Sequence, residues 1–125
     1  MDLSIEIRQL NQIVILELSG RVSVPDLCLR RCAEGLLERG IRYFIINLAN
    51  VTYMDNGGLG QLCWIYTVSR NRGGDMKLLR PTSRIRKLLS ITKLDTIFQS
   101  FECEAEAVLS MQSQSMPLSI SANGY

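Results

Sequence analysis

The chain has 125 residues, of which 46% are apolar and 21% are charged. This length and composition suit one globular domain with a single core, and they exclude a disordered or fibrous chain. Lysine and arginine number 14 against 12 acidic residues, so the nearly balanced charge predicts no direct binding to nucleic acid. No apolar stretch approaches the roughly 20 residues that cross a bilayer, and the acidic N-terminus is unlike a signal peptide. We therefore expect a cytoplasmic protein with no membrane partner.

Two β-type runs open the chain, at 5–7 and 13–18, and the polar residues between them predict an antiparallel strand pair that ends at Gly20. Pro25 then stands where the first turn of a helix is expected, and apolar residues recur after it at helical spacing. The run Tyr43–Leu48 is almost continuously apolar. This is the pattern of a strand in the middle of a sheet, covered on both faces.

The C-terminal half is predicted to continue the alternation of helices and strands. In chain order, the elements are a helix from Gly57 to Gly73, a strand over 76–79, a helix opened by Pro81, a short strand over 94–98 and a helix over 102–111. Serine and glutamine dominate from 112 onward, so we expect a domain at 1–111 and a mobile tail at 112–125.

This order of elements predicts the class of fold. Strands that alternate with helices imply right-handed βα units and a largely parallel sheet. We therefore expect a single α/β domain with a mixed sheet of four to five strands, an antiparallel N-terminal strand pair and about four helices.

The four cysteines are scattered through apolar surroundings, which favours reduced core thiols over a disulfide framework. They are Cys28, Cys32, Cys63 and Cys103. Cys28 and Cys32 share a helical face, but the chain has no histidine and no second cysteine pair from which to build a zinc site. We expect no metal and no cofactor.

One segment, Met54–Gly60, has the composition of a binding site. It lies between the predicted central strand and a helix, at the carboxyl end of the sheet, where open α/β folds bind ligands. Its glycines permit a close approach of another molecule, and free N–H groups at a helix start favour negative charge. The simpler explanation is that Asn56 caps the helix and the glycines close the turn. Three glycines in four residues exceed what a cap requires, so we favour a site.

Enzymatic chemistry finds little support in the sequence. The glycines have neither the dinucleotide-binding spacing nor a following phosphate-loop lysine. A serine or cysteine nucleophile has no histidine base, and the acidic residues show no paired spacing. We expect a binding protein and no catalytic residues.

Several of these features occur together in one known family. They are the Leu18-Ser19-Gly20 turn, the strand ending Asn47-Leu48, the aspartate-led turn Met54–Gly60, the pair Gly73-Gly74, and the helix after Pro81 with Ile85-Arg86-Lys87-Leu88-Leu89. From Ser4 to Met111 the chain resembles the STAS family, and in particular the bacterial anti-sigma factor antagonists.

The resemblance implies a mechanism called partner switching. Such an antagonist binds an anti-sigma factor, usually a serine kinase, and frees a sigma factor to direct transcription until phosphorylation of a serine ends the binding. The phosphoacceptor position is Asn56 here, and the next position, often also serine, is Gly57. An acidic residue near the first turn is replaced by Ser23. We therefore expect binding that is constitutive, or controlled by abundance or by another modification.

The partner-binding residues that the resemblance implies lie in two turns. They are Gly20, Arg21, Val22, Ser23, Asp55, Asn56, Gly57, Gly58 and Leu59. The alternative is a sensory STAS module that binds a small anion or a nucleotide at the helix start after Asp55, assisted by Arg21 or Arg84. The sequence leaves the oligomeric state open, a homodimer included.

Overall fold

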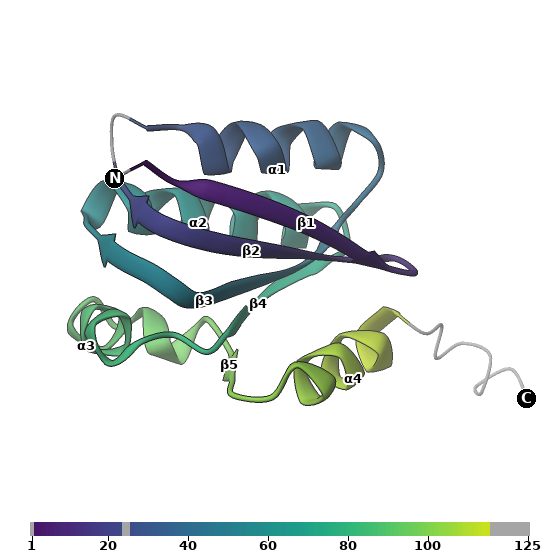
Figure 1. Ribbon diagram of the computed structural model, residues 1–125. Helices are drawn as coiled ribbons and strands as arrows, with labels where there is room; N and C mark the ends of the chain where they lie inside the picture. Colours follow the sequence, from purple (N-terminus) through teal and green to yellow (C-terminus); the bar gives the residue numbers. More distant parts are fainter. Residues whose placement is uncertain (1, 24–25, 116–125) are drawn as a thin grey trace, which may run out of the picture.

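The computed structural model describes residues 2–23 and 26–115. A five-stranded sheet forms its centre, with helices on both faces (Figure 1). The elements in chain order are β1 (Ser4–Leu10), β2 (Ile13–Val22), α1 (Cys28–Glu38), β3 (Tyr43–Met54), α2 (Asn56–Asn71), β4 (Asp75–Leu79), α3 (Ser83–Ile91), the 3₁₀ turn η1 (Leu94–Thr96), β5 (Ser100–Phe101) and α4 (Glu104–Ser115).

The strands lie in the sheet in their order along the chain, so β3 is the central strand. β1 pairs with β2 antiparallel, with Ile5 opposite Leu18, and every later pair is parallel. The predicted class is confirmed: this is a single α/β domain with a mixed, mostly parallel sheet, an antiparallel N-terminal pair and four α-helices among the described residues.

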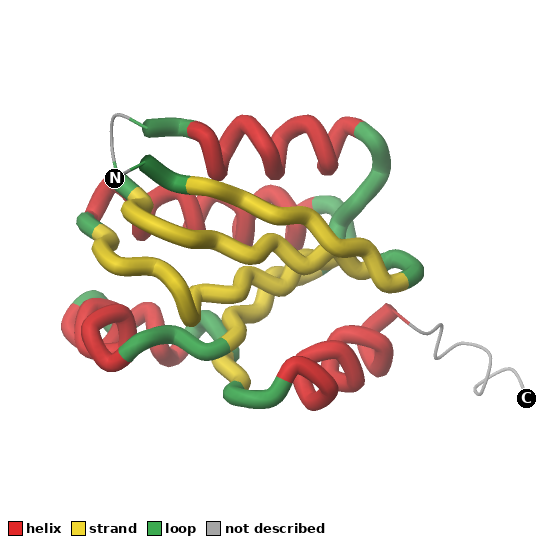
Figure 2. Tube along the Cα trace, viewed as in Figure 1, coloured by secondary structure: helices red, strands yellow, loops and turns green. Residues whose placement is uncertain are grey.

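Alternate side chains of β2, β3 and β4 enter two separate cores. Val14 and Leu16 of β2 belong to the larger core, which also takes residues from α1, α2 and α3. Ile13 and Ile15 belong to a smaller core that α4 closes. Figure 2 shows the same division, with α1 and α2 on one side of the yellow strands and α4 on the other. The centre of the sheet is therefore buried on both faces, as the continuous apolar run of β3 predicted, whereas the edge strand β1 is largely exposed.

β3 is longer than the predicted strand and continues from Leu48 to Met54. The added residues include valine, threonine and tyrosine, which favour extended chain. β4 does not follow this extension, because its register with β3 ends where Asn47 meets Leu79. Beyond Asn47, β3 is paired with β2 alone among the described strands.

The prediction of a strand over 94–98 is wrong. Lys93 has a left-handed backbone conformation with φ 66°, and residues 94–96 then form a 3₁₀ turn. The last strand is the two-residue β5 that follows. The apolar positions Leu94, Ile97 and Phe98 have spacings of three and four, which fit a helical turn as well as a strand.

The ends of two helices also differ from those expected. α1 begins at Cys28, and Pro25 lies outside the described residues. α4 extends through Ser115, so the start of the predicted tail is helical, and residues 116–125 lie outside the described part of the chain. None of the described helices has the length and apolar character needed to cross a membrane.

The four cysteines are free thiols. The prediction that all four are core residues is wrong for Cys28 and Cys103, which are exposed on the surface. Cys32 and Cys63 are partly buried, and this burial raises the pKa of both thiols because it disfavours the thiolate. In the described residues, no group of three or more potential metal-ligating side chains comes together.

Candidate functional site

The segment that the sequence singled out forms the junction between β3 and α2. Asp55 stands at this junction in an extended conformation, and its Oδ1 accepts a hydrogen bond from the N–H of Gly58 at 2.8 Å. Its carbonyl oxygen accepts from the N–H of Leu59 at 2.9 Å. Asp55 is therefore the helix cap, and the simpler explanation that assigned the cap to Asn56 is wrong. Asn56 is the first helical residue and is exposed.

The structure brings the two predicted turns together. Val22, at the end of β2, lies beside Met54, at the end of β3. The N–H of Asp55 donates a hydrogen bond to the carbonyl oxygen of Val22 at 3.4 Å. Because parallel strands end at the same edge of a sheet, residues more than thirty positions apart in sequence form one surface here.

Gly58 lies against the backbone of β2. A Cβ atom at this position would be 2.0 Å from the carbonyl oxygen of Val22, which is far inside any tolerated contact. At Gly60, by contrast, a Cβ atom would meet nothing within 4 Å. The close approach that a glycine permits at position 58 is thus made by the chain's own strand.

The residues predicted to bind a partner differ in their exposure. Gly20, Val22, Gly58 and Leu59 are buried, whereas Arg21 and Asn56 are exposed and Ser23, Asp55 and Gly57 are partly exposed. The buried group sets the positions of the strand ends and the helix. We call the remaining residues, Arg21, Ser23, Asp55, Asn56 and Gly57, the α2-start surface.

Tyr53 is a neighbour of this surface that the sequence analysis missed. It lies opposite Arg21 in the register of β2 and β3, and the Arg21 guanidinium lies 4.4 Å from the centre of its ring. The Tyr53 side chain is 39% exposed. The sequence does show an aromatic residue two positions before the turn. Only the strand register, however, shows that its ring contacts an arginine.

Gln61 fixes the position of α1 relative to the start of α2. It is 5% exposed, its Nε2 donates to the carbonyl oxygen of Asp26 at 3.0 Å, and its Oε1 accepts from the N–H of Arg30 at 3.2 Å. The Arg30 guanidinium lies 4.4 Å from the centre of the Trp64 ring. These contacts join the two helices near the start of α2, and no sequence pattern predicted them.

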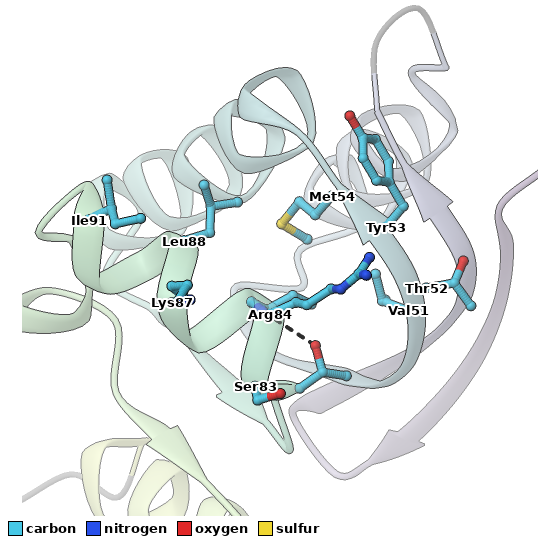
Figure 3. Close-up of a pocket in the computed structure, with 11 residues that line it drawn as sticks. Val51, Thr52, Tyr53, Met54, Ser83, Arg84, Lys87, Leu88 and Ile91 are labelled. Atoms are coloured by element: carbon cyan, nitrogen blue, oxygen red, sulfur yellow. Dashed lines mark hydrogen bonds between the residues drawn. The ribbon is translucent and has the colours of Figure 1, made fainter.

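A groove of about 660 Å³ lies on the other side of Tyr53, between the end of β3 and α3 (Figure 3). The residues that line it are Val51, Thr52, Tyr53, Met54, Thr82, Ser83, Arg84, Ile85, Lys87, Leu88 and Ile91. From the sequence, Arg84 was expected only to assist an anion at the α2 start. The structure places Arg84 with Lys87 in this separate groove.

The chain is similar in sequence to a known domain family and to several known proteins. Residues 4–107 match the family described as the STAS domain. The chain is 25% identical over 114 residues to an anti-sigma F factor antagonist from Paenibacillus polymyxa, covering 90% of this chain and 97% of that protein. It is 29% identical over 98 residues to an anti-sigma-B factor antagonist from Bacillus subtilis, covering 78% and 89%.

Solved structures show the same fold. The crystal structure of a putative anti-sigma factor antagonist from Thermotoga maritima has a TM-score of 0.81 at 22% identity, covering 86% of this chain and 94% of that one. The anti-sigma factor antagonist SpoIIAA in its unphosphorylated form has a TM-score of 0.73 at 16% identity, covering 88% and 97%.

Proposed function

Because the chain belongs to the STAS domain family, we propose that it is an anti-sigma factor antagonist that binds a kinase-type anti-sigma factor through the α2-start surface. The observation that carries the proposal is the meeting of the β2 and β3 ends at the start of α2, where Asn56 is exposed as the first helical residue. Two relatives named as antagonists match most of the chain, which supports the same class of function. The proposal gives the chain a binding role in the cytoplasm and no catalytic one.

Asn56 determines how such binding is regulated. A phosphate at this position would add nearly two negative charges beside Asp55, and like charges at a tight interface oppose association. The asparagine amide carries no charge and accepts no phosphate. We therefore propose that the partner is bound constitutively, or is controlled through the abundance of this chain or another modification.

The alternative, a small anion or nucleotide at the α2 start, has less support. The Asp55 carboxylate already accepts the N–H of Gly58 and places a negative charge where the anion would bind. Arg21 is stacked on Tyr53, and Arg84 lines the separate groove. At least one of the N–H groups at the helix start thus already has a hydrogen-bond acceptor within the chain.

Binding of the purified chain to the kinase-type anti-sigma factor of the same organism, measured by isothermal titration calorimetry, tests the proposal. We expect Asn56→Asp to weaken binding by about tenfold or more, because it places a second carboxylate in the contact. Asn71→Asp makes the same change at the exposed far end of α2 and serves as the matched control. Equal affinities for wild type and Asn56→Asp, or no binding by wild type, would contradict the proposal.

A gain of regulation tests the role of Asn56 separately. With ATP and the same partner, we expect Asn56→Ser to become phosphorylated and then to be released, while the wild-type chain stays unmodified and bound. Intact-mass spectrometry reports the phosphate, and gel filtration reports the release. Phosphorylation of the wild-type chain near Asp55 would show that another residue serves as acceptor.

A further inference from the structure

The outer edge of β3 is open beyond the end of β4. The β3–β4 register ends at the pair Asn47 and Leu79, whereas β3 continues to Met54. Within the described residues, the strand pairing of 50–54 is with β2 only. A strand edge of this kind presents N–H and C=O groups that another extended chain can pair with.

The groove beside α3 runs along this edge. Its lining includes four consecutive strand residues, Val51–Met54, although successive side chains of a strand point to opposite faces. A cavity that touches all four therefore follows the edge of the strand. Figure 3 shows α3 across from this segment, with Arg84 extending into the space between them. Thr52 and Tyr53 are exposed, so the edge is accessible.

Two cations in the groove have no acidic partner in the part of the chain that the structure describes. Among the described residues, the ion pair of α3 is the one between Arg86 and Glu102, and neither Arg84 nor Lys87 forms one. The described residues that line the groove include no aspartate or glutamate. An occupant with carboxylates would supply the missing charge, and an occupant with lysines would be repelled.

The α3 wall also carries exposed apolar surface. Ile91 is 71% exposed, the largest value among the large apolar side chains of the described chain, and Leu88 lies one turn before it. These side chains lie on the same wall as Lys87. The groove thus offers apolar contact, positive charge and an open strand edge together.

We propose that this groove binds an extended, acidic segment of a partner protein, which pairs with the β3 edge at Val51–Met54 as an added strand. Its backbone pairs with β3, its carboxylates contact Arg84 and Lys87, and its apolar side chains cover Leu88 and Ile91. Main-chain pairing supplies affinity in this mode of recognition, and side-chain contacts supply specificity. This surface shares no residue with the α2-start surface, so the inference does not depend on the proposed antagonist function.

A short synthetic peptide tests the site without knowledge of the natural partner. The probe is a fluorescein-labelled peptide of about six residues that alternates valine and glutamate, long enough to span the exposed part of β3. We expect saturable binding by fluorescence anisotropy. A peptide with lysine in place of glutamate should not bind, and backbone N-methylation of the acidic peptide should weaken binding by about tenfold or more, because it removes the donors of the added strand.

Variants of the protein separate local recognition from general charge attraction. The double variant Arg84→Gln with Lys87→Gln should bind the acidic peptide about tenfold or more weakly than the wild-type protein does. The control pair Arg31→Gln with Arg39→Gln removes the same charge from exposed positions on or next to α1 and should change affinity less than about twofold. Equal losses in the two double variants would overturn the proposal.

Amide chemical shifts locate the peptide. On titration of isotope-labelled protein, we expect the signals of 51–54 and 84–91 to move together. No saturable binding of the acidic peptide up to about 1 mM, or shifts confined to 56–60, would overturn the proposal, the latter because it would assign the anion to the α2 start.

Discussion

Gly58 and Gly60 lie half a turn apart on α2, yet a methyl group would meet opposite surroundings at the two positions. We expect Gly58→Ala to destabilise the fold by about 1–3 kcal/mol, because its Cβ atom would collide with the Val22 carbonyl oxygen. Gly60→Ala should stabilise it by up to about 1 kcal/mol, because the space is open and alanine favours a helix. Urea unfolding measures both free energies.

The opposite signs are the essential result. If both variants lost stability equally, the contact between Gly58 and β2 would not be the cause. A practical consequence concerns binding experiments. A substitution at Gly58 is expected to destabilise the fold, so a loss of partner binding after such a change would not locate an interface. Substitutions at exposed Asn56 avoid this problem.

Asn56→Asp should affect stability and binding in opposite directions. A carboxylate in the first turn of a helix interacts favourably with the helix dipole, by about 0.3–1 kcal/mol at low salt. We therefore expect the thermal midpoint of this variant to stay the same or rise, while its affinity for the anti-sigma factor falls. A lower midpoint in calorimetry would mean that the loss of binding comes from a damaged fold.

At the scale of elements, an arginine joins α4 to the edge of the sheet. Arg8 Nη2 donates to Glu104 Oε1 at 2.5 Å and to Glu17 Oε2 at 2.7 Å. The hydrogen bond from Arg8 lowers the pKa of Glu104. Since the folded pKa lies below the unfolded one, this contribution is complete at neutral pH and is lost as the pH falls through the folded pKa.

We expect Glu104→Gln to destabilise the protein at pH 7 by no more than about 1 kcal/mol, because both partners are partly exposed to solvent. The difference from wild type should shrink as the pH falls below about 4.3, where an unperturbed glutamate, as in the unfolded chain, is half protonated. Urea midpoints at pH 7 and at about pH 3 check this sign. A difference that grew on acidification would contradict the assigned interaction.

The elements that could be predicted from the sequence are those with long periodic patterns. The apolar run beginning at Tyr43 identified the central strand, and helical spacing identified α2 and α3. Residues 94–98 were wrongly predicted as a strand, because five residues contain too little periodicity to separate a strand from a 3₁₀ turn. The left-handed conformation of Lys93, which ends α3 and starts that turn, has no signature in the sequence.

The candidate site was predictable in part for a similar reason. A turn after a buried strand points to the carboxyl edge of a sheet, so Asp55–Leu59 was identified as a candidate. The groove was missed because it depends on how far β4 extends along β3, and strand register is a long-range property. Asp55 rather than Asn56 became the cap because its carboxylate reaches the N–H of Gly58.

On the scale of the whole molecule, the smaller core depends on one helix. Met111 of α4 is fully buried against the sheet, whereas Leu109 of the same helix is 63% exposed. We expect Met111→Ala to cost about 2–5 kcal/mol in unfolding free energy, and Leu109→Ala to change it by less than about 0.5 kcal/mol. Urea unfolding measures both, and equal costs would argue against a distinct core under α4.

The position of α4 at the end of the described chain also has a consequence for folding. It is the last of the described elements along the chain, so it is the last that can dock on the sheet. Until then, one face of the sheet exposes Ile13, Ile15 and Ile45 to water. Such a folding intermediate is prone to aggregation, because it exposes apolar sheet surface. The time that α4 takes to dock therefore sets how long the folding chain is exposed to this risk.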